Sequence, residues 1–258
     1  MAMARPRATN PMLRINNAVK RLLPTWNQVE QVLNNDDNNG YFLCRATLGE
    51  WKIYVKSDSQ KFKSRFMTWR NGSIYITELP KGIHEVICSV LDSDVIQATG
   101  TGYMHLLHHG STYVDGLEHI EPDCSFGPRR NVPGAQLPQG LDNWLEYHTL
   151  KVEIGVFQRW PALDEKVNQW WHFPGLRYIL CIRVSRSLRQ RQFIYYTVNQ
   201  NVPPPQLIPA NIVNPTLVEF DSRLLLGLQP GDPLPAGFSD PNVVVNLFNF
   251  VQVVNMEL

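Results

Sequence analysis

Two acidic residues stand where a charge is hard to accommodate. Asp123 follows Pro122 at the start of an apolar segment, and Glu153 lies in the centre of a strand-like stretch, residues 149–156. An ionised carboxylate in such a strand is costly unless it is paired, protonated or bound to a metal. Two carboxylates on neighbouring strands can share Mg²⁺, which binds through one or two carboxylates, waters and a substrate phosphate. The chemistry that this arrangement predicts is attack of a metal-activated water on phosphorus.

The alternative for the same pair is structural: Glu153 pairs with Lys151 or an arginine, and Asp123 caps a turn. Other catalytic patterns are excluded by spacing. His105, His108 and His109 do not follow a zinc-ligand pattern, and the His-Glu step at 84–85 has cysteine in place of the second histidine of HExxH. The sequence contains neither a phosphate-binding glycine loop of the GxGxxG or Walker A type nor a GxSxG nucleophile elbow.

The elements around these carboxylates follow from hydrophobic periodicity. In 149–156 the aliphatic residues alternate with Lys151, Glu153 and Gly155, which predicts a strand with two different faces. Pro161 opens a predicted helix over 160–171, and the apolar run 178–184 predicts a buried strand with 193–198 paired beside it. An apolar stripe predicts a helix over 80–97. Strand, helix and strand in succession indicate an α/β or α+β core with a mixed sheet flanked by helices.

The remaining segments are predicted as additions to that core. The first eleven residues are expected to be a flexible lead-in, and residues 12–71 an N-terminal extension with a helix over 12–33, broken by Pro24. Strands are predicted over 41–48 and 51–56, joined as a hairpin at Gly49-Glu50, and a third over 73–78 after the turn Asn71-Gly72. The core is expected over 72–198, and the proline-rich residues 199–258 are expected to wrap around it.

Several short segments occur in an order that resembles a known superfamily. They are Glu78-Leu79-Pro80, His84-Glu85, the run 121–128 (EPDCSFGP), the run 152–156 (VEIGV), the helix that ends in Trp170-Trp171 and the strand after it. Together they are similar to a group of largely uncharacterised fungal and oomycete proteins with a PD-(D/E)xK restriction-endonuclease-like core. The resemblance covers about residues 72–225 and implies an α-β-β-β-α-β plan.

The resemblance implies a metal site made of three acidic residues. Asp123 matches the aspartate of the Pro-Asp motif, Glu153 matches the second carboxylate, and Glu85 matches the extra acidic residue that many such nucleases supply from the preceding helix. The expected cofactor is Mg²⁺ or Mn²⁺, and the expected reaction is hydrolysis of phosphodiester bonds in DNA or RNA.

The sequence departs from the family pattern at one position: Gly155 stands where the motif has a lysine. Related families move this lysine to the following helix, where Lys166 lies, and Lys151 on the strand is the other candidate. Gln158 falls where related sequences often keep a polar residue. The protein is therefore expected either to be an active nuclease or to be a degenerate one that still binds nucleic acid.

Charge and composition bound the partners. The chain has 24 basic and 23 acidic residues, so no global field marks a polyanion-binding protein. Between residues 167 and 218, however, no acidic residue occurs, and we expect four arginines there to contact nucleic acid: Arg183, Arg186, Arg189 and Arg191. The alternative is a solvated turn. The second basic stretch, residues 52–70, has the same two interpretations.

Cysteine usage and hydropathy bear on the compartment. The four cysteines are well separated, which is typical of reduced intracellular thiols, and no 18-residue apolar stretch predicts a membrane span. We therefore expect a cytoplasmic or nuclear protein without a membrane partner.

A second hypothesis for function is a non-enzymatic binding or assembly module whose proline-rich tail supports self-association as a homodimer. The two hypotheses differ in whether a lysine reaches the carboxylates.

Overall fold

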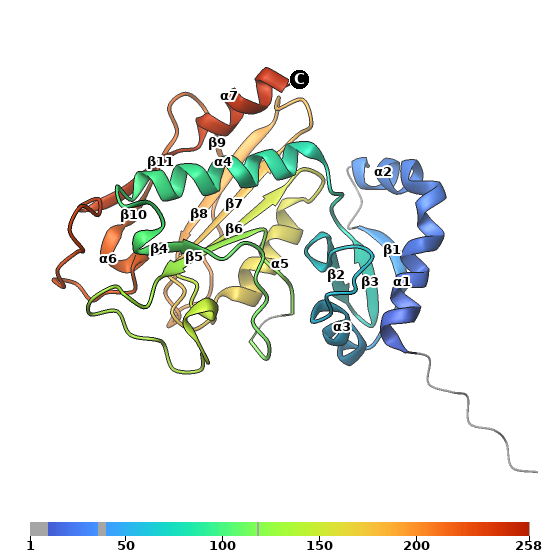
Figure 1. Cartoon of the computed structure of the whole chain (residues 1–258). Helices are drawn as coiled ribbons and strands as arrows, with labels where there is room; N and C mark the ends of the chain where they lie inside the picture. The colour runs from blue at the N-terminus through green and yellow to red at the C-terminus, as the bar shows by residue number, and fades with distance from the viewer. Residues whose placement is uncertain (1–9, 36–39, 118, 258) are drawn as a thin grey trace, which may run out of the picture. The chain divides into compact units, whose positions relative to one another are not determined.

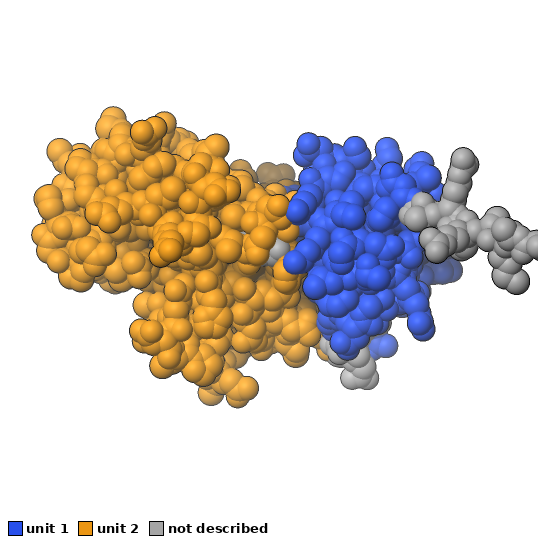
Figure 2. Space-filling view, turned by 90° about the horizontal axis from the view of Figure 1, so that it is seen from below, with its two compact units in different colours: residues 1–79 blue, residues 80–258 orange. Residues whose placement is uncertain are grey.

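The chain divides into two units, residues 1–79 and 80–258 (Figure 2). The computed structural model describes residues 10–35, 40–117 and 119–257, so nearly all of the predicted lead-in lies outside the described residues. The division follows Leu79, whereas the sequence placed it after residue 71. The difference has a simple cause: β3 (Ser73–Ile76) pairs with two strands of the first unit.

The first unit combines helices with a small antiparallel sheet. Two helices, α1 (Pro11–Leu22) and α2 (Trp26–Asn34), are separated by a 3₁₀ turn (Leu23–Thr25) at Pro24, where the sequence predicts a break. The sheet has the order β1-β3-β2, with β1 over Tyr41–Arg45 and β2 over Met67–Arg70. Asn71 and Gly72 both have positive φ in the two-residue turn between β2 and β3, as expected of an Asn-Gly hairpin.

One predicted strand of this unit is wrong. Residues 51–56 were expected to form the second arm of a hairpin, but the segment is the helix α3 (Leu48–Val55). Thr47 and Glu50 form a capping box: the Thr47 hydroxyl accepts from the Glu50 amide, and the Glu50 carboxylate accepts from the Thr47 amide at 2.8 Å. This reciprocal pair satisfies two of the helix's free amide groups, so Gly49-Glu50 starts a helix instead of turning a hairpin.

The second unit is built on a six-stranded mixed sheet of order β4-β5-β6-β7-β8-β9 (Figure 1). Its strands are β4 (Leu106–His108), β5 (Cys124–Pro128), β6 (Leu150–Gly155), β7 (Tyr178–Val184), β8 (Arg191–Thr197) and β9 (Ala210–Asn211). Only β6 and β7 are parallel, and the helix α5 (Trp160–Trp170) connects them. With α4 (Gly82–Ala98) before β4, the chain follows the expected α-β-β-β-α-β order, and the mixed α+β class is confirmed.

The alternation of β6 divides the core into two layers. Val152 and Ile154 belong to one apolar cluster with Ile87 and Leu91 of α4, whereas Ile179 and Cys181 of β7 belong to another with residues of α5. The two helices therefore cover opposite faces of the sheet (Figure 1). Lys151 and Glu153, which alternate with the first set, project toward the α5 layer.

The C-terminal segment packs on the α4 layer and belongs to the same unit as the sheet. Its elements are β10 (Leu217–Asp221), α6 (Ser222–Leu225), β11 (Asn242–Asn246) and α7 (Phe248–Glu257). β10 and β11 form a separate two-stranded antiparallel sheet, and α7 lies beside α4 (Figure 1). In the described part of the chain, no helix is both long enough and apolar enough to cross a membrane.

Candidate functional site

Asp123 and Glu153 meet across two neighbouring strands. Cys124 of β5 is the partner of Val152 of β6, so Asp123, one step before β5, takes the position opposite Glu153. The amide of Ile154 donates to Asp123 Oδ2 at 2.8 Å, which fixes the carboxylate against β6. Directly opposed side chains of an antiparallel pair lie close together. The structure therefore brings together the two carboxylates that the sequence singled out.

Lys166 reaches this pair from α5, the layer toward which Glu153 projects. It lies in the second half of α5, and its Nζ forms an ion pair with Glu153 Oε1. Both side chains are buried: Glu153 is 0% exposed and Lys166 4%. Apart from this ion pair, neither oxygen of Glu153 accepts a hydrogen bond from the residues that the structure describes. The lysine that the resemblance displaces to the following helix is thus at the carboxylate.

His84 completes the group, although no sequence motif assigns it a role in the site. The imidazole, at the start of α4, is fully buried, and its Nε2 lies 3.1 Å from Asp123 Oδ1. Burial alone would disfavour the charged ring, but the Asp123 carboxylate outweighs it and raises the pKa of His84 to about 12. A sequence signal existed: His84 is in register with Ile87, Leu91 and Val95 on the buried face of α4.

The charges around Asp123 also determine its own protonation. Burial opposes ionisation, yet His84 and, after it, Lys166 and the Ile154 amide hold the pKa of Asp123 below its usual range. Asp123 and Glu153 are thus offset by His84 and Lys166. The buried group is two carboxylates and two cations, formally neutral.

Glu85 does not join the two carboxylates. Its side chain is half-exposed, and its Oε1 lies 3.4 Å from the far nitrogen of His84, Nδ1. Consecutive residues on a helix point about 100° apart, so His84 and Glu85 cannot both face Asp123. The imidazole occupies the place where the resemblance put the third acidic ligand.

Gln158 and Gly155 are linked by the backbone after β6. Gln158 is 3% exposed, and its carbonyl accepts from Arg183 Nε at 3.2 Å. A Cβ on Gly155 would lie 3.1 Å from both Cβ and O of Gln158, which is tighter than ordinary contact. A lysine at 155 would displace this turn, so the close return of residue 158 accounts for glycine at the motif position.

Lys151 is fully buried and engaged elsewhere. Its Nζ lies 2.8 Å from His148 Nδ1 and 4.2 Å from the centre of the Phe173 ring. His148 in turn stacks on Phe173, and its ring centre is 4.9 Å from that of His109. Of the two candidate lysines, Lys166 contacts Glu153, whereas Lys151 belongs to a separate buried cluster with the two histidines.

The four arginines between β7 and β8 do not form a single exposed patch. Arg186 and Arg189 are exposed, and Arg186 lies over the Phe157 ring at 4.6 Å. Arg191 donates from Nε to the Ile212 carbonyl at 2.8 Å and from Nη1 to the Leu188 carbonyl at 3.0 Å. Arg183 is partly buried against Gln158. Of the four, Arg186 and Arg189 are exposed, whereas Arg183 and Arg191 are partly buried.

Asp123 and Glu153 provide oxygen atoms of the kind that a hard divalent ion binds. Apart from the ion pair with Lys166, the Glu153 oxygens have no hydrogen-bond donor in the described part of the chain. Mg²⁺ needs no more than one or two carboxylates. The described residues contain no cluster of three or more His, Cys, Asp or Glu side chains arranged to hold a metal, so an all-protein cage is not available among them.

Comparisons with known proteins add no relative: no protein-family model, curated protein or solved structure matches this chain.

Proposed function

We propose that the second unit is a divalent-metal-dependent phosphodiesterase that acts on DNA or RNA. One observation carries the proposal. Asp123, just before β5, is opposite Glu153 of β6, and Lys166 of α5 forms an ion pair with Glu153. Such a set provides oxygen ligands for Mg²⁺ or Mn²⁺ and a cation for the phosphate that approaches it. The resemblance to PD-(D/E)xK proteins supports the same assignment.

Each residue has a separate task in this proposal. The ion, held by Asp123 and Glu153, would supply an activated water and polarise the phosphoryl oxygens. His84 holds Asp123 in place and keeps it ionised. Lys166, once Glu153 ligates the ion, offsets the negative charge that grows on the phosphate during in-line attack. Gln158 lies at the end of β6, where its amide would orient the substrate. Glu85 takes no part as a direct ligand.

The carboxylates give the sharpest test. Asp123→Asn and Glu153→Gln keep the side-chain shape but remove the negative charge, so each should lower the rate of cleavage by at least about 100-fold, because a metal ion supplies several kcal/mol of transition-state stabilisation. Cleavage of single- and double-stranded DNA and RNA would be measured with Mg²⁺ and with Mn²⁺, below the melting temperature of each variant.

Glu219→Gln is the matched control. Glu219 is exposed on β10, and its carboxylate accepts from Asn242 Nδ2 at 2.8 Å, a contact that glutamine can keep. This variant should cleave at the wild-type rate. Cleavage that persists in both Asp123→Asn and Glu153→Gln would show that the proposed site does not catalyse the reaction.

Nucleic-acid binding has its own prediction. Because Arg186 and Arg189 are the exposed members of the four arginines, changing both to alanine should reduce the slope of log affinity against log salt by about 2. Binding should weaken to a similar degree for all sequences, since phosphate contacts carry no base information. Fluorescence anisotropy on a labelled oligonucleotide at several salt concentrations measures both. An unchanged slope would mean that the two arginines are ordinary solvated surface.

A second function, a non-enzymatic binding or assembly module, is favoured by a different observation. The cations His84 and Lys166 already neutralise the two carboxylates, and Asp123, Glu153 and Lys166 are each at most 4% exposed. In that role the core is a scaffold, and the tail after β8 would mediate self-association. Absence of Mn²⁺ binding to the wild-type protein in equilibrium dialysis, together with a dimer in analytical ultracentrifugation, would favour the module over the enzyme.

A further inference from the structure

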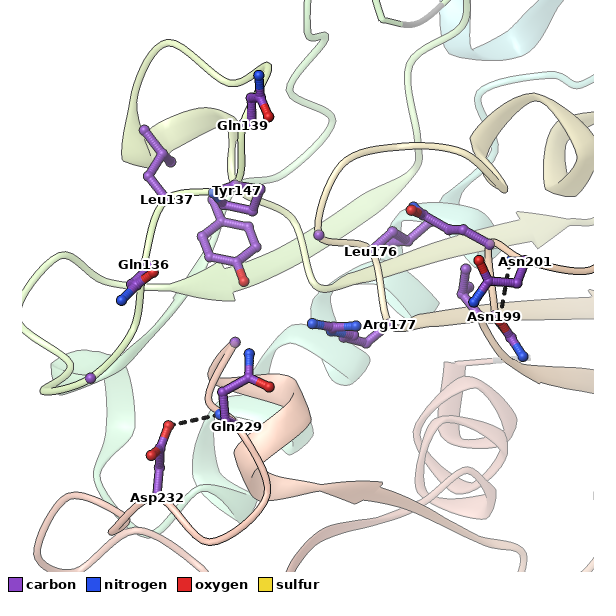
Figure 3. Close-up of a pocket in the computed structure, with 16 residues that line it drawn as sticks. Gln136, Leu137, Gln139, Tyr147, Leu176, Arg177, Asn199, Asn201, Gln229 and Asp232 are labelled. Carbon is purple, nitrogen blue, oxygen red and sulfur yellow. Dashed lines mark hydrogen bonds between the residues drawn. The ribbon is translucent and has the colours of Figure 1, made fainter.

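A polar cavity of about 840 Å³ opens in the second unit, away from the carboxylates (Figure 3). Tyr147, just before β6, and Arg177, just before β7, line it, whereas Glu153 lies toward the opposite end of β6. Segments after β8 and after α6 complete the wall. The cavity is therefore at the edge where β6 and β7 begin, and nothing in the proposed phosphodiesterase site uses it.

Glycines in two loops shape this cavity around the Tyr147 ring. A Cβ on Gly227 would lie 2.1 Å from the Tyr147 hydroxyl, and one on Gly175 would lie 2.5 Å from Cε2 of the same ring. Both glycines have positive φ, at 69° and 76°. No other residue fits these two positions without strain and displacement of the ring. The position of the hydroxyl in the cavity wall thus depends on both loops.

Arg177 supplies a cation that has no carboxylate partner in the described part of the chain. Its Nε is buried and makes no hydrogen bond to a described residue. The acidic residue of the cavity is Asp232, and its Oδ2 accepts a hydrogen bond from the backbone amide of Gln229 at 2.8 Å. Figure 3 shows the side chains of Tyr147, Arg177 and Gln229 converging on one space. Burial raises the pKa of Tyr147, so its hydroxyl remains a donor.

The rest of the lining is neutral and rich in hydrogen-bonding groups. Six carboxamide side chains line the cavity: Gln136, Gln139, Asn199, Gln200, Asn201 and Gln229. Two of them serve the fold, since Gln200 Nε2 donates to the Phe173 carbonyl and Asn199 Oδ1 accepts from the Asn201 amide. The side-chain amides of the other four make no hydrogen bond to a described residue. Each offers a donor and an acceptor together.

We propose that this cavity binds a small phosphorylated molecule with a neutral, hydrogen-bonding body, the chemistry shared by mononucleotides and sugar phosphates. A phosphoryl group presents three acceptor oxygens. These match three converging donors: the Arg177 guanidinium, the Tyr147 hydroxyl and the side-chain amide of Gln229. A carboxylate has two oxygens and would leave one donor unused. The three remaining unengaged carboxamides, those of Gln136, Gln139 and Asn201, match the hydroxyls of a sugar or the edge of a base.

The experiment is isothermal titration of the full chain with AMP, ribose 5-phosphate, adenosine and glucuronate. Binding of AMP or ribose 5-phosphate, with at least tenfold weaker binding of adenosine and glucuronate, is expected because Arg177 contributes a charge-assisted contact. Tighter binding of AMP than of ribose 5-phosphate would identify the ligand as a nucleotide, and equal binding would identify it as a sugar phosphate. If neither phosphorylated probe binds, or if glucuronate binds as well as they do, the proposal is overturned.

Variants localise the ligand. Arg177→Met should weaken binding of the phosphorylated probe at least tenfold, Arg177→Lys should retain part of it, and Gly227→Ala should weaken it by displacing Tyr147. Arg189→Met, which removes an exposed cation outside the cavity, should bind as the wild type does. Wild-type affinity in Arg177→Met would contradict the assignment.

Discussion

Replacing Lys166 with methionine is expected to lower the free energy of unfolding by about 3–5 kcal/mol, because the change leaves Glu153 ionised and unpaired in the interior. Glu153 is 0% exposed, and its oxygens have no other donor among the described residues, so water cannot readily replace the ammonium group. Methionine nearly matches lysine in length, which keeps any cavity small. Urea denaturation followed by tryptophan fluorescence measures the loss, since Trp170 and Trp171 lie at the end of the same helix.

The double variant Lys166→Met/Glu153→Leu separates charge from packing. Removing both charges eliminates the unpaired carboxylate, so most of the lost stability should return, and the double variant should lie within about 1–2 kcal/mol of the wild type. Arg189→Met is the surface control and should change stability by less than about 0.5 kcal/mol. Equal stability of the single variant and the wild type would show that Glu153 is neutral or hydrated in the folded protein.

The parts of the site that could be predicted are those set by strand periodicity. Alternation in 149–156 places Glu153 on the face opposite Val152 and Ile154, and the structure has it there. The contact between Lys166 and Glu153, by contrast, depends on how α5 packs across β7, which no local pattern encodes. The expectation that Lys166 belongs to the site came from the resemblance to a known family and not from periodicity, and Lys166 does contact Glu153.

The errors have equally local causes. Residues 51–56 contain aromatic and β-branched residues that favour a strand, but the Thr47–Glu50 capping box stabilises the start of a helix over this segment. Glu85 was expected at the metal site because the resemblance matches it to an extra acidic residue of such nucleases, whereas the helical register gives the position facing Asp123 to His84. In both cases the position of a polar residue on its helix was the stronger evidence.

Proton uptake by His109 and His148 on unfolding is expected to cost the protein about 3–4 kcal/mol of stability between pH 7 and pH 5, because both rings are held neutral in the folded state. Burial, and after it the charges of His108 and Lys151, lower the pKa of His109 to about 4. Burial, Lys151 and His109 hold the pKa of His148 well below its usual value. Both histidines regain their ordinary pKa of about 6.5 on unfolding.

The sign follows from proton uptake. Below about pH 6.5 the unfolded chain binds protons at these two positions and the folded protein does not, so acid favours unfolding. Above that pH neither state binds a proton there, and the two positions no longer contribute to the pH dependence of stability. The double variant His109→Gln/His148→Gln keeps an acceptor for Lys151 Nζ but cannot titrate at these positions, so it should lack this loss across the same range. Urea midpoints at pH 7, 6 and 5 measure the difference. Parallel pH curves for the wild type and the double variant would mean that the two rings bind protons as readily in the folded protein as in the unfolded chain.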